Sequence, residues 1–279
     1  MPPKAGAQPN QSLIDGIVTL QALATSDEPI GCRALARRLG METTRVNRLL
    51  KTLNFLGLAH QTASRKYTAG PGMHVLAAQS LYASGLLRNA IGPMEKLQRF
   101  GRVVALGVLW RDSVSFLYHA QTGMSPGEAI GRIGLIPATK SGVGMALLAD
   151  ASEEHVRQMY EDQVIPGFPK GIKSLLTSLN QIKKTGYARI EVAPAETLYP
   201  GEPHHTIAVP VGNPITSALG MSGWIPESAI PDVVEALFAA KHDIETAEVN
   251  GEAPQLNIAE LSERFNLHTL LPVDVDSSS

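Results

Sequence analysis

The sequence predicts a mixed α/β protein in which an N-terminal winged helix-turn-helix is joined by a linker helix to a larger α/β domain. Two short helical patterns separated by a glycine turn are followed by two short strand patterns. Strands and helices then alternate without a strict repeat, and Gly70-Pro71-Gly72 separates the two regions. With 279 residues and 44% hydrophobic content, the chain is long enough for two cores.

Three helices are predicted in the first domain. Ser12 can cap the first, whose inward residues are predicted to be Leu13, Ile17, Leu20 and Leu23. The second covers residues 33–39, and Gly40 permits the tight turn after it. The third starts near Thr43 and ends at Gly57. Its predicted buried stripe is Val46, Leu49, Leu50, Leu53 and Leu56.

The third helix is basic on the face opposite its apolar stripe. Two strand patterns, 58–61 and 66–68, follow it and form a hairpin with a basic tip. Such a helix fits the major groove of duplex DNA, and the hairpin tip can reach the phosphate backbone. The candidate DNA contacts are Thr43, Thr44, Arg45, Asn47, Arg48, Lys51, Arg65 and Lys66. We expect one or two of the helix residues to form internal salt bridges instead, Arg48 first.

Charge is distributed unevenly along the chain. The formal net charge is −2, which argues against a general polyanion binder. Residues 1–75 hold nine Lys and Arg against four Asp and Glu, a net +5, so the remainder carries −7. A basic first domain on an acidic body is expected when only one domain meets nucleic acid.

These patterns divide the chain into five parts. They are a disordered tail (1–11), the winged helix-turn-helix (12–71), a linker helix (72–90), an α/β domain (91–249) and a C-terminal extension (250–279). Helices of the α/β domain are expected near 93–100, 142–149, 153–160, 175–186 and 231–247. Strands are expected near 103–109, 113–120, 128–134, 205–211 and 218–224.

The segment from Lys140 to Ala149 is the most suggestive one in the second domain. Ser141 can cap a helix whose first free amides belong to Gly142, Val143 and Gly144. Those amides and the positive end of the helix dipole can hold an anion, and a carboxylate is the natural guest. The alternative is an ordinary capped helix packed against a sheet.

The motifs of common enzymes are not found in the sequence, so we expect no enzyme, cofactor or metal site. His204 and His205 are adjacent, and a strand beginning there turns only one of them inward. The single cysteine suggests a reducing compartment, and no secretory leader or membrane-spanning stretch is evident, so a cytoplasmic protein is expected. A small-molecule enzyme with a helical module and a protein-docking winged helix remain alternatives.

The chain resembles IclR-type bacterial transcription regulators. The resemblance lies in Leu35-Ala-Arg-Arg-Leu-Gly, Val46-Asn-Arg-Leu-Leu-Lys-Thr-Leu, Tyr67-Thr-Ala-Gly-Pro, Pro137-Ala-Thr-Lys-Ser-Gly-Val-Gly-Met-Ala-Leu-Leu-Ala, Thr185-Gly-Tyr-Ala and Ile207-Ala-Val-Pro-Val. It implies a homodimer or dimer of dimers, binding to operator DNA, and a GAF/profilin-like domain for a small organic-acid effector. The effector site implied in this way comprises Ile136, Ser141, Gly142, Val143, Thr206 and Ser222.

The chain departs from the family pattern at several of these positions. Ile190 stands where the family has an acidic residue, Thr206 replaces a common cysteine, and Gly220 replaces one of two usual serines. Thr139 replaces a histidine, and Met145 a lysine. These changes remove polar contacts and add apolar surface, so a larger, partly aromatic or aliphatic acid is predicted rather than glyoxylate or pyruvate.

Overall fold

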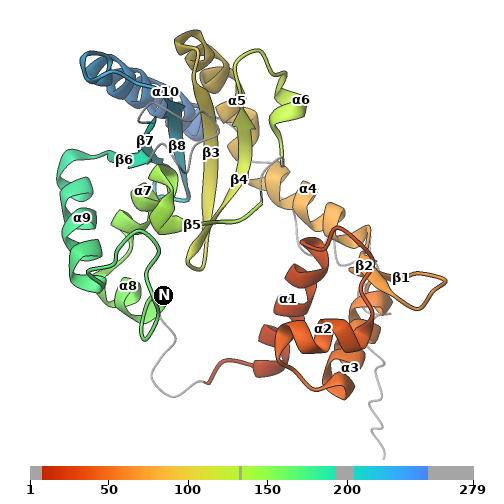
Figure 1. Cartoon of the computed structure of the whole chain (residues 1–279). Helices are drawn as coiled ribbons and strands as arrows, with labels where there is room; N and C mark the ends of the chain where they lie inside the picture. Colours follow the sequence, from red (N-terminus) through yellow and green to blue (C-terminus); the bar gives the residue numbers. More distant parts are fainter. Residues whose placement is uncertain (1–7, 132–133, 193–203, 251–279) are drawn as a thin grey trace, which may run out of the picture. The chain divides into compact units, whose positions relative to one another are not determined.

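The computed structural model describes residues 8–131, 134–192 and 204–250. Most of the tail predicted over 1–11 and of the extension predicted over 250–279 lies outside these ranges. The chain divides into two compact units, Met1–Tyr82 and Ala83–Ser279, called here the N-terminal and C-terminal units. Each unit is described by itself (Figure 1).

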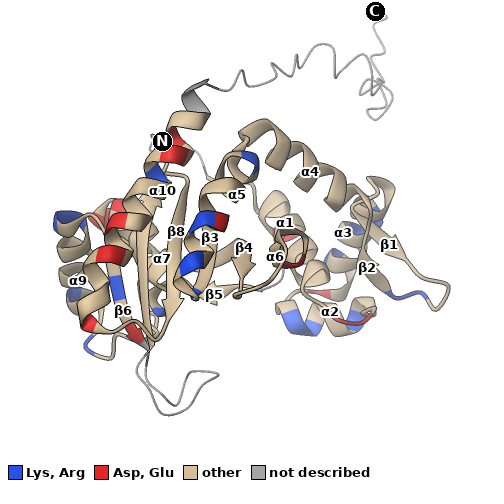
Figure 2. Ribbon diagram, turned by 90° about the horizontal axis from the view of Figure 1, so that it is seen from above, with Lys and Arg blue, Asp and Glu red and all other residues tan. Residues whose placement is uncertain are grey.

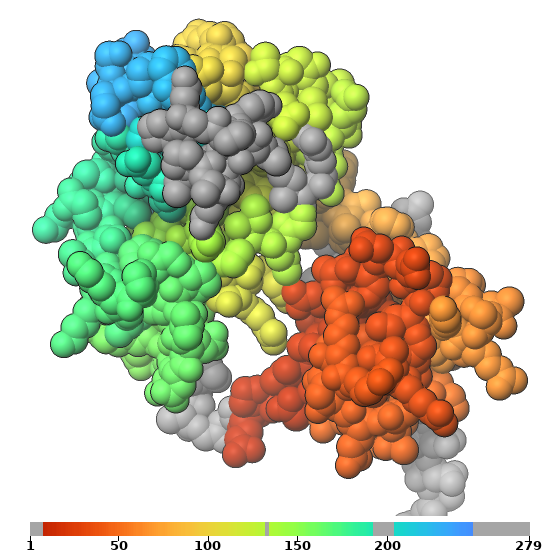
Figure 3. All heavy atoms as spheres, in the orientation of Figure 1, coloured from red at the N-terminus to blue at the C-terminus, as the bar shows by residue number. Residues whose placement is uncertain are grey.

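The N-terminal unit is a winged helix-turn-helix, as predicted. Its elements are α1 (Gln11–Ala24), α2 (Cys32–Leu39), α3 (Thr43–Phe55), β1 (Ala59–Gln61) and β2 (Tyr67–Ala69). Leu23, Leu35 and Leu50 form the centre of its core, each at most 2% exposed. Gly40 is left-handed at φ 64°, which ends α2 and turns the chain towards α3. The β1–β2 hairpin projects from the helices as the wing (Figure 1, Figure 3).

The predicted inward face of α1 is half right, because Leu20 and Leu23 are buried whereas Leu13 and Ile17 are not. Asn10 caps the helix in place of Ser12, because its side-chain oxygen accepts hydrogen bonds from the amides of Ser12 and Leu13. Leu13 and Ile17 are 65% and 41% exposed. The buried stripe instead includes Asp15 and Thr19, two polar residues one turn apart whose side chains have partners inside the unit.

Two further boundaries differ from the predictions. Leu56 is 46% exposed, because it is the C-cap of α3 and lies beyond the last buried turn. The linker helix α4 (Gly72–Ser84) ends at Gly85, whose left-handed φ of 64° breaks it from α5 (Leu86–Leu97). Pro93 therefore lies inside α5 rather than at a helix start.

The C-terminal unit is built on one six-stranded sheet in the order β5-β4-β3-β8-β7-β6, with every pairing antiparallel. The strands are β3 (Val103–Trp110), β4 (Ser113–Ala120), β5 (Ile136–Pro137), β6 (Ala188–Val192), β7 (His204–Val211) and β8 (Ser217–Gly223). α5 and α10 (Ile230–Asn250) pack together on one face. The other face carries α7 (Gly142–Asp150) and α9 (Ile172–Thr185), with α8 (Glu153–Met159) beside them (Figure 1).

Two strand predictions in this unit are wrong. Part of the segment 128–134 belongs to the short helix α6 (Pro126–Ala129), which begins in a capping box made by Ser125 and Glu128. Residues 188–192, for which no strand was predicted, form β6. Ala188 and Ile190 pack against the core, whereas Arg189 and Glu191 lie on the opposite face. This alternation at period two is the strand signal that the sequence analysis missed.

Candidate nucleic-acid interface and ligand site

The cationic face of α3 is held at the surface by the core beneath it. Val46, Leu50 and Leu53 are buried, and they recur at the helical spacing of one face. Arg48 and Lys51, on the other side of the helix, are exposed. The ribbon in Figure 2 is coloured for Lys and Arg on α2, on α3 and at the turn of the hairpin.

The eight candidate contacts differ in their solvent exposure and in whether their charges are paired. Thr43, Thr44, Arg48 and Lys51 are exposed, and Asn47 is half-buried. Among the described residues, none forms an ion pair with Arg48, although this residue was expected to form one first.

The internal salt bridge is made by Arg45. Its guanidinium pairs with the carboxylate of Asp15 on α1, whose side chain is 7% exposed. The expectation that Arg48 would be the paired residue is therefore wrong, because α1 crosses α3 one turn earlier. No helical or strand period in the sequence points to a buried aspartate, so sequence reasoning missed Asp15.

The wing is fixed to α3 by a side-chain contact. Asn54 near the end of α3 accepts a hydrogen bond from the amide of Gln61 through Oδ1 at 3.0 Å. At the turn, the amide of Arg65 donates to the carbonyl of Thr62 at 2.9 Å, and Arg65 has a positive φ of 59°. Arg65 and Lys66 are both exposed at this turn.

In the C-terminal unit, the start of α7 lies directly against β7. Ser141 caps α7 and accepts a hydrogen bond from the amide of Gly144 at 3.3 Å. Helix geometry leaves the amides of Gly142 and Val143 without intrahelical acceptors. A Cβ at Gly142 would lie 2.5 Å from Cγ2 of Thr206, so only glycine permits this approach.

Beside this helix start, a row of residues crosses the sheet. The register pairs Ile190 with Thr206 and Thr206 with Ser222, so the three side chains share the face that carries α7. The hydroxyls of Thr206 and Ser222 are hydrogen-bonded at 2.9 Å. A Cβ at Gly220 would lie 2.9 Å from Cγ2 of Val143, which explains why a serine does not fit there.

Five of the six predicted effector residues lie at the start of α7 or on the two strands beside it. Ile136 lies on the edge strand β5, with three strands between it and β7 in the sheet order, and it packs against the core cluster that contains Val143.

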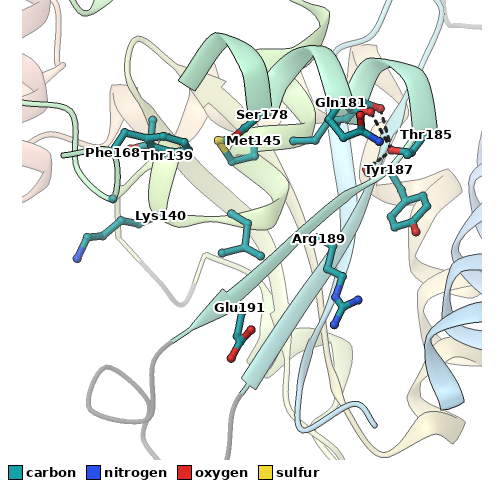
Figure 4. A pocket seen from close by; sticks show the side chains of 13 residues that line it. Thr139, Lys140, Met145, Phe168, Ser178, Gln181, Thr185, Tyr187, Arg189 and Glu191 are labelled. Carbon is teal, nitrogen blue, oxygen red and sulfur yellow. Dashed lines mark hydrogen bonds between the residues drawn. The ribbon is translucent and has the colours of Figure 1, made fainter. Parts of the chain in front are cut away.

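A cavity of about 740 Å³ opens between α9, β6 and the segment before α7. In Figure 4, Thr139, Met145, Phe168 and Ser178 lie together at one end, and Arg189 and Glu191 extend from β6. Among the described residues that line it, none is one of the six predicted for the effector. It nevertheless borders them, because lining residue Lys140 precedes Ser141 and Ile190 is the cross-strand partner of Thr206.

The titratable groups near the cavity are shifted by burial and by one ion pair. Burial, reinforced by the carboxylate of Asp112, raises the pKa of Tyr160 to about 12. Its hydroxyl therefore stays protonated near Thr139. On β6, the hydrogen bonds that Arg189 donates to Glu227 lower the pKa of that carboxyl.

Metal clusters and membrane-spanning helices are both absent from the described part of the chain. Within residues 8–131, 134–192 and 204–250, no group of three or more His, Cys, Asp or Glu is placed to hold a metal ion. No helix in the same ranges has the length and apolar character needed to cross a membrane.

Comparison with known proteins identifies the N-terminal unit. Residues 16–63 match the IclR helix-turn-helix domain. The chain is 30% identical over 165 residues to the HTH-type transcriptional regulator BhcR of Paracoccus denitrificans, covering 55% of this chain and 57% of BhcR. It is 25% identical over 188 residues to the transcriptional repressor IclR of Escherichia coli, covering 64% and 68% of the two chains. Residues 16–63 therefore form an IclR helix-turn-helix domain, and the chain as a whole is similar to IclR-type transcription regulators.

Solved structures of IclR proteins have the same fold as this chain. An IclR family transcriptional regulator from Brucella abortus has a TM-score of 0.66 at 23% identity, covering 86% of this chain and 93% of its own. An IclR homolog from Microbacterium hydrocarbonoxydans, complexed with 4-hydroxybenzoate, has a TM-score of 0.62 at 21% identity, covering 86% and 100%. The predicted fold class and family resemblance are thus confirmed. Matched residues span 57% of the length of BhcR.

Proposed function

We propose that this chain is a transcriptional regulator, and not an enzyme, that binds palindromic promoter DNA and governs a catabolic operon. The observation that carries the proposal is the exposed cationic face of α3, held over a buried apolar stripe inside an IclR helix-turn-helix domain. Thr43, Thr44, Asn47, Arg48 and Lys51 are the proposed groove contacts. Arg65 and Lys66 on the wing are the proposed backbone contacts.

Self-association would place two such helices on one palindromic site. α4 contains no charged residue, and none of its residues, all of them described, is buried. Val75, Leu76 and Tyr82 are 52%, 54% and 59% exposed. Apolar surface of this extent favours a homodimer or dimer of dimers through this helix. Light scattering of the purified chain tests this part.

A small organic acid is the proposed effector. Its carboxylate would be held by the amides of Gly142 and Val143 and by the hydroxyls of Thr206 and Ser222. The neighbouring cavity of about 740 Å³ would take the rest of the molecule, and this volume is far larger than a two- or three-carbon acid needs. The 4-hydroxybenzoate bound to the IclR homolog of similar fold supports an aromatic acid. Effector binding would be coupled to DNA binding through α4.

Two measurements test the function. Selection from random duplexes should enrich a palindromic motif, and affinity for it should fall steeply with salt, whereas a docking module would lose little. If no motif is enriched, with or without candidate acids, the proposal that this chain is a transcriptional regulator is refuted.

For the effector, calorimetric titration should show tighter binding of 4-hydroxybenzoate or a similar acid than of glyoxylate. The variant Thr206→Val keeps the side-chain shape but loses the hydroxyl, so it should weaken binding. Tight binding of glyoxylate without any binding of larger acids would contradict the proposed effector class.

A further inference from the structure

Arg45 differs from the other cations on α3 because its charge is already paired. Its guanidinium meets the Oδ2 atom of Asp15. The Oδ1 atom of the same carboxylate accepts a hydrogen bond from Nε2 of Gln11 at 2.8 Å. Both oxygens of Asp15 therefore have partners, one on α1 and one on α3.

This pair lies where α1 and α3 pack against each other. Gly16 follows Asp15, and a Cβ at this glycine would lie 3.9 Å from Cδ2 of Leu49 on α3. One turn later on α1, the hydroxyl of Thr19 donates to the carbonyl of Asp15 at 2.7 Å. The backbone and the side chain of Asp15 are thus both held at the crossing.

Burial of Asp15 makes loss of the ion pair energetically costly. The side chain of Asp15 is 7% exposed, whereas that of Arg45 is 45% exposed. A carboxylate removed from water is strongly destabilising when its cation leaves, so moving Arg45 onto a phosphate would expose that cost. The pair is also neutral as a unit, and it adds no net charge to the face that meets a polyanion.

We propose that Arg45 and Asp15 form a clamp that positions the first turn of α3, and that Arg45 does not contact DNA. Arg45 is a positioning residue, and the cationic contacts of this helix come from Arg48 and Lys51. This inference rests on the proposed function for its DNA part. The clamp itself is a property of the folded N-terminal unit and can be tested without DNA.

Thermal unfolding of the full chain tests the clamp. Asp15→Asn and Arg45→Gln should each lower the midpoint by several degrees, and the double variant should be little worse than either one. Asp27→Asn is the matched control, because it makes the same charge change at an exposed residue and should leave the midpoint unchanged. Additive losses, or a loss in Asp15→Asn no larger than in Asp27→Asn, would overturn the clamp whether or not the chain binds DNA.

The salt dependence of duplex binding tests the role of Arg45. Lys51→Gln should reduce the slope of log affinity against log salt by about 0.9 for each phosphate that it no longer neutralises, whereas Arg45→Gln should leave the slope unchanged. Asp15→Asn releases a cation at this face, so the slope should become steeper. A reduction in Arg45→Gln equal to that in Lys51→Gln would overturn the inference. Absence of duplex binding by the wild-type chain would instead refute the proposed function.

Discussion

Replacing Gly142 by alanine tests the close contact between α7 and the sheet. Gly142 is the first residue of α7 and is buried. A Cβ there would lie 2.5 Å from Cγ2 of Thr206 and 3.1 Å from its carbonyl oxygen. Carbon atoms in ordinary contact are about 3.5–4.0 Å apart, so the helix start and β7 must separate by about 1 Å.

The size of the effect follows from this displacement. Overpacking of this kind costs about 1–3 kcal/mol, and the reduced freedom of alanine in the unfolded chain offsets about 0.4–1 kcal/mol. We expect the free energy of unfolding to fall by about 1–2 kcal/mol, or roughly 2–8 °C in the melting midpoint of a unit of this size. The shift also draws the amides of Gly142 and Val143 away from Thr206. Affinity for an acid effector should therefore fall by roughly tenfold or more, the worth of one hydrogen bond to a charged group.

The assay combines thermal unfolding with calorimetric titration of the best-binding acid. Gly127→Ala is the matched control, because Gly127 lies in α6 with no atom within 4 Å of the added Cβ. It should keep the affinity and leave the melting midpoint unchanged or slightly raised. If Gly142→Ala behaves like Gly127→Ala in both measurements, the reasoning from the helix–strand contact is refuted.

Three further predictions concern single side chains. Leu50→Ala should cost about 2–5 kcal/mol of unfolding free energy, because Leu50 is fully buried, whereas Phe55→Ala at 70% exposure should change it little; urea unfolding compares the two. Burial raises the pKa of the Cys32 thiol despite the opposing charge of a neighbouring arginine, so its alkylation should lag behind that of a free thiol at pH 8, and equal rates would contradict this. Arg189→Gln should raise the pKa of Glu227 in an NMR titration. Since that pKa is lowered in the folded chain, the ion pair stabilises the folded state at pH values above the usual glutamate pKa, and this stabilisation is lost as the pH falls through the lowered value. A titration of Glu227 that is unchanged in the variant would contradict the pairing.

Periodicity predicted the elements whose buried residues are aliphatic and regularly spaced. The stripe of Val46, Leu50 and Leu53 placed α3, and Gly40 placed the turn before it, because one apolar face and one left-handed glycine leave few other arrangements. The same reasoning was right for the second half of α1, where Leu20 and Leu23 are buried, and failed for the first half. Its inward face carries Asp15, and a carboxylate enters a core only when a cation from another element reaches it.

For a similar reason, the part of the candidate ligand site that depends on local sequence was predicted, and the part that depends on contacts between distant elements was not. The cap at Ser141 is a local feature of sequence and is present in the structure. The cavity wall from α9 and β6 was not predicted, since nothing local in residues 172–192 states which helix faces which strand. Ile136 was assigned to the site through the resemblance, and the structure packs it against the core cluster that contains Val143.

By itself, the sequence determined most of the local elements, the charge asymmetry between the two ends of the chain and the resemblance to IclR-type regulators. These depend on spacing and composition within short segments. Only the tertiary structure decided which cation of α3 is neutralised, that Gly142 lies against Thr206, and where a cavity remains between α9 and β6. Those features depend on contacts between residues far apart in the chain, and the register and crossing of whole elements set them.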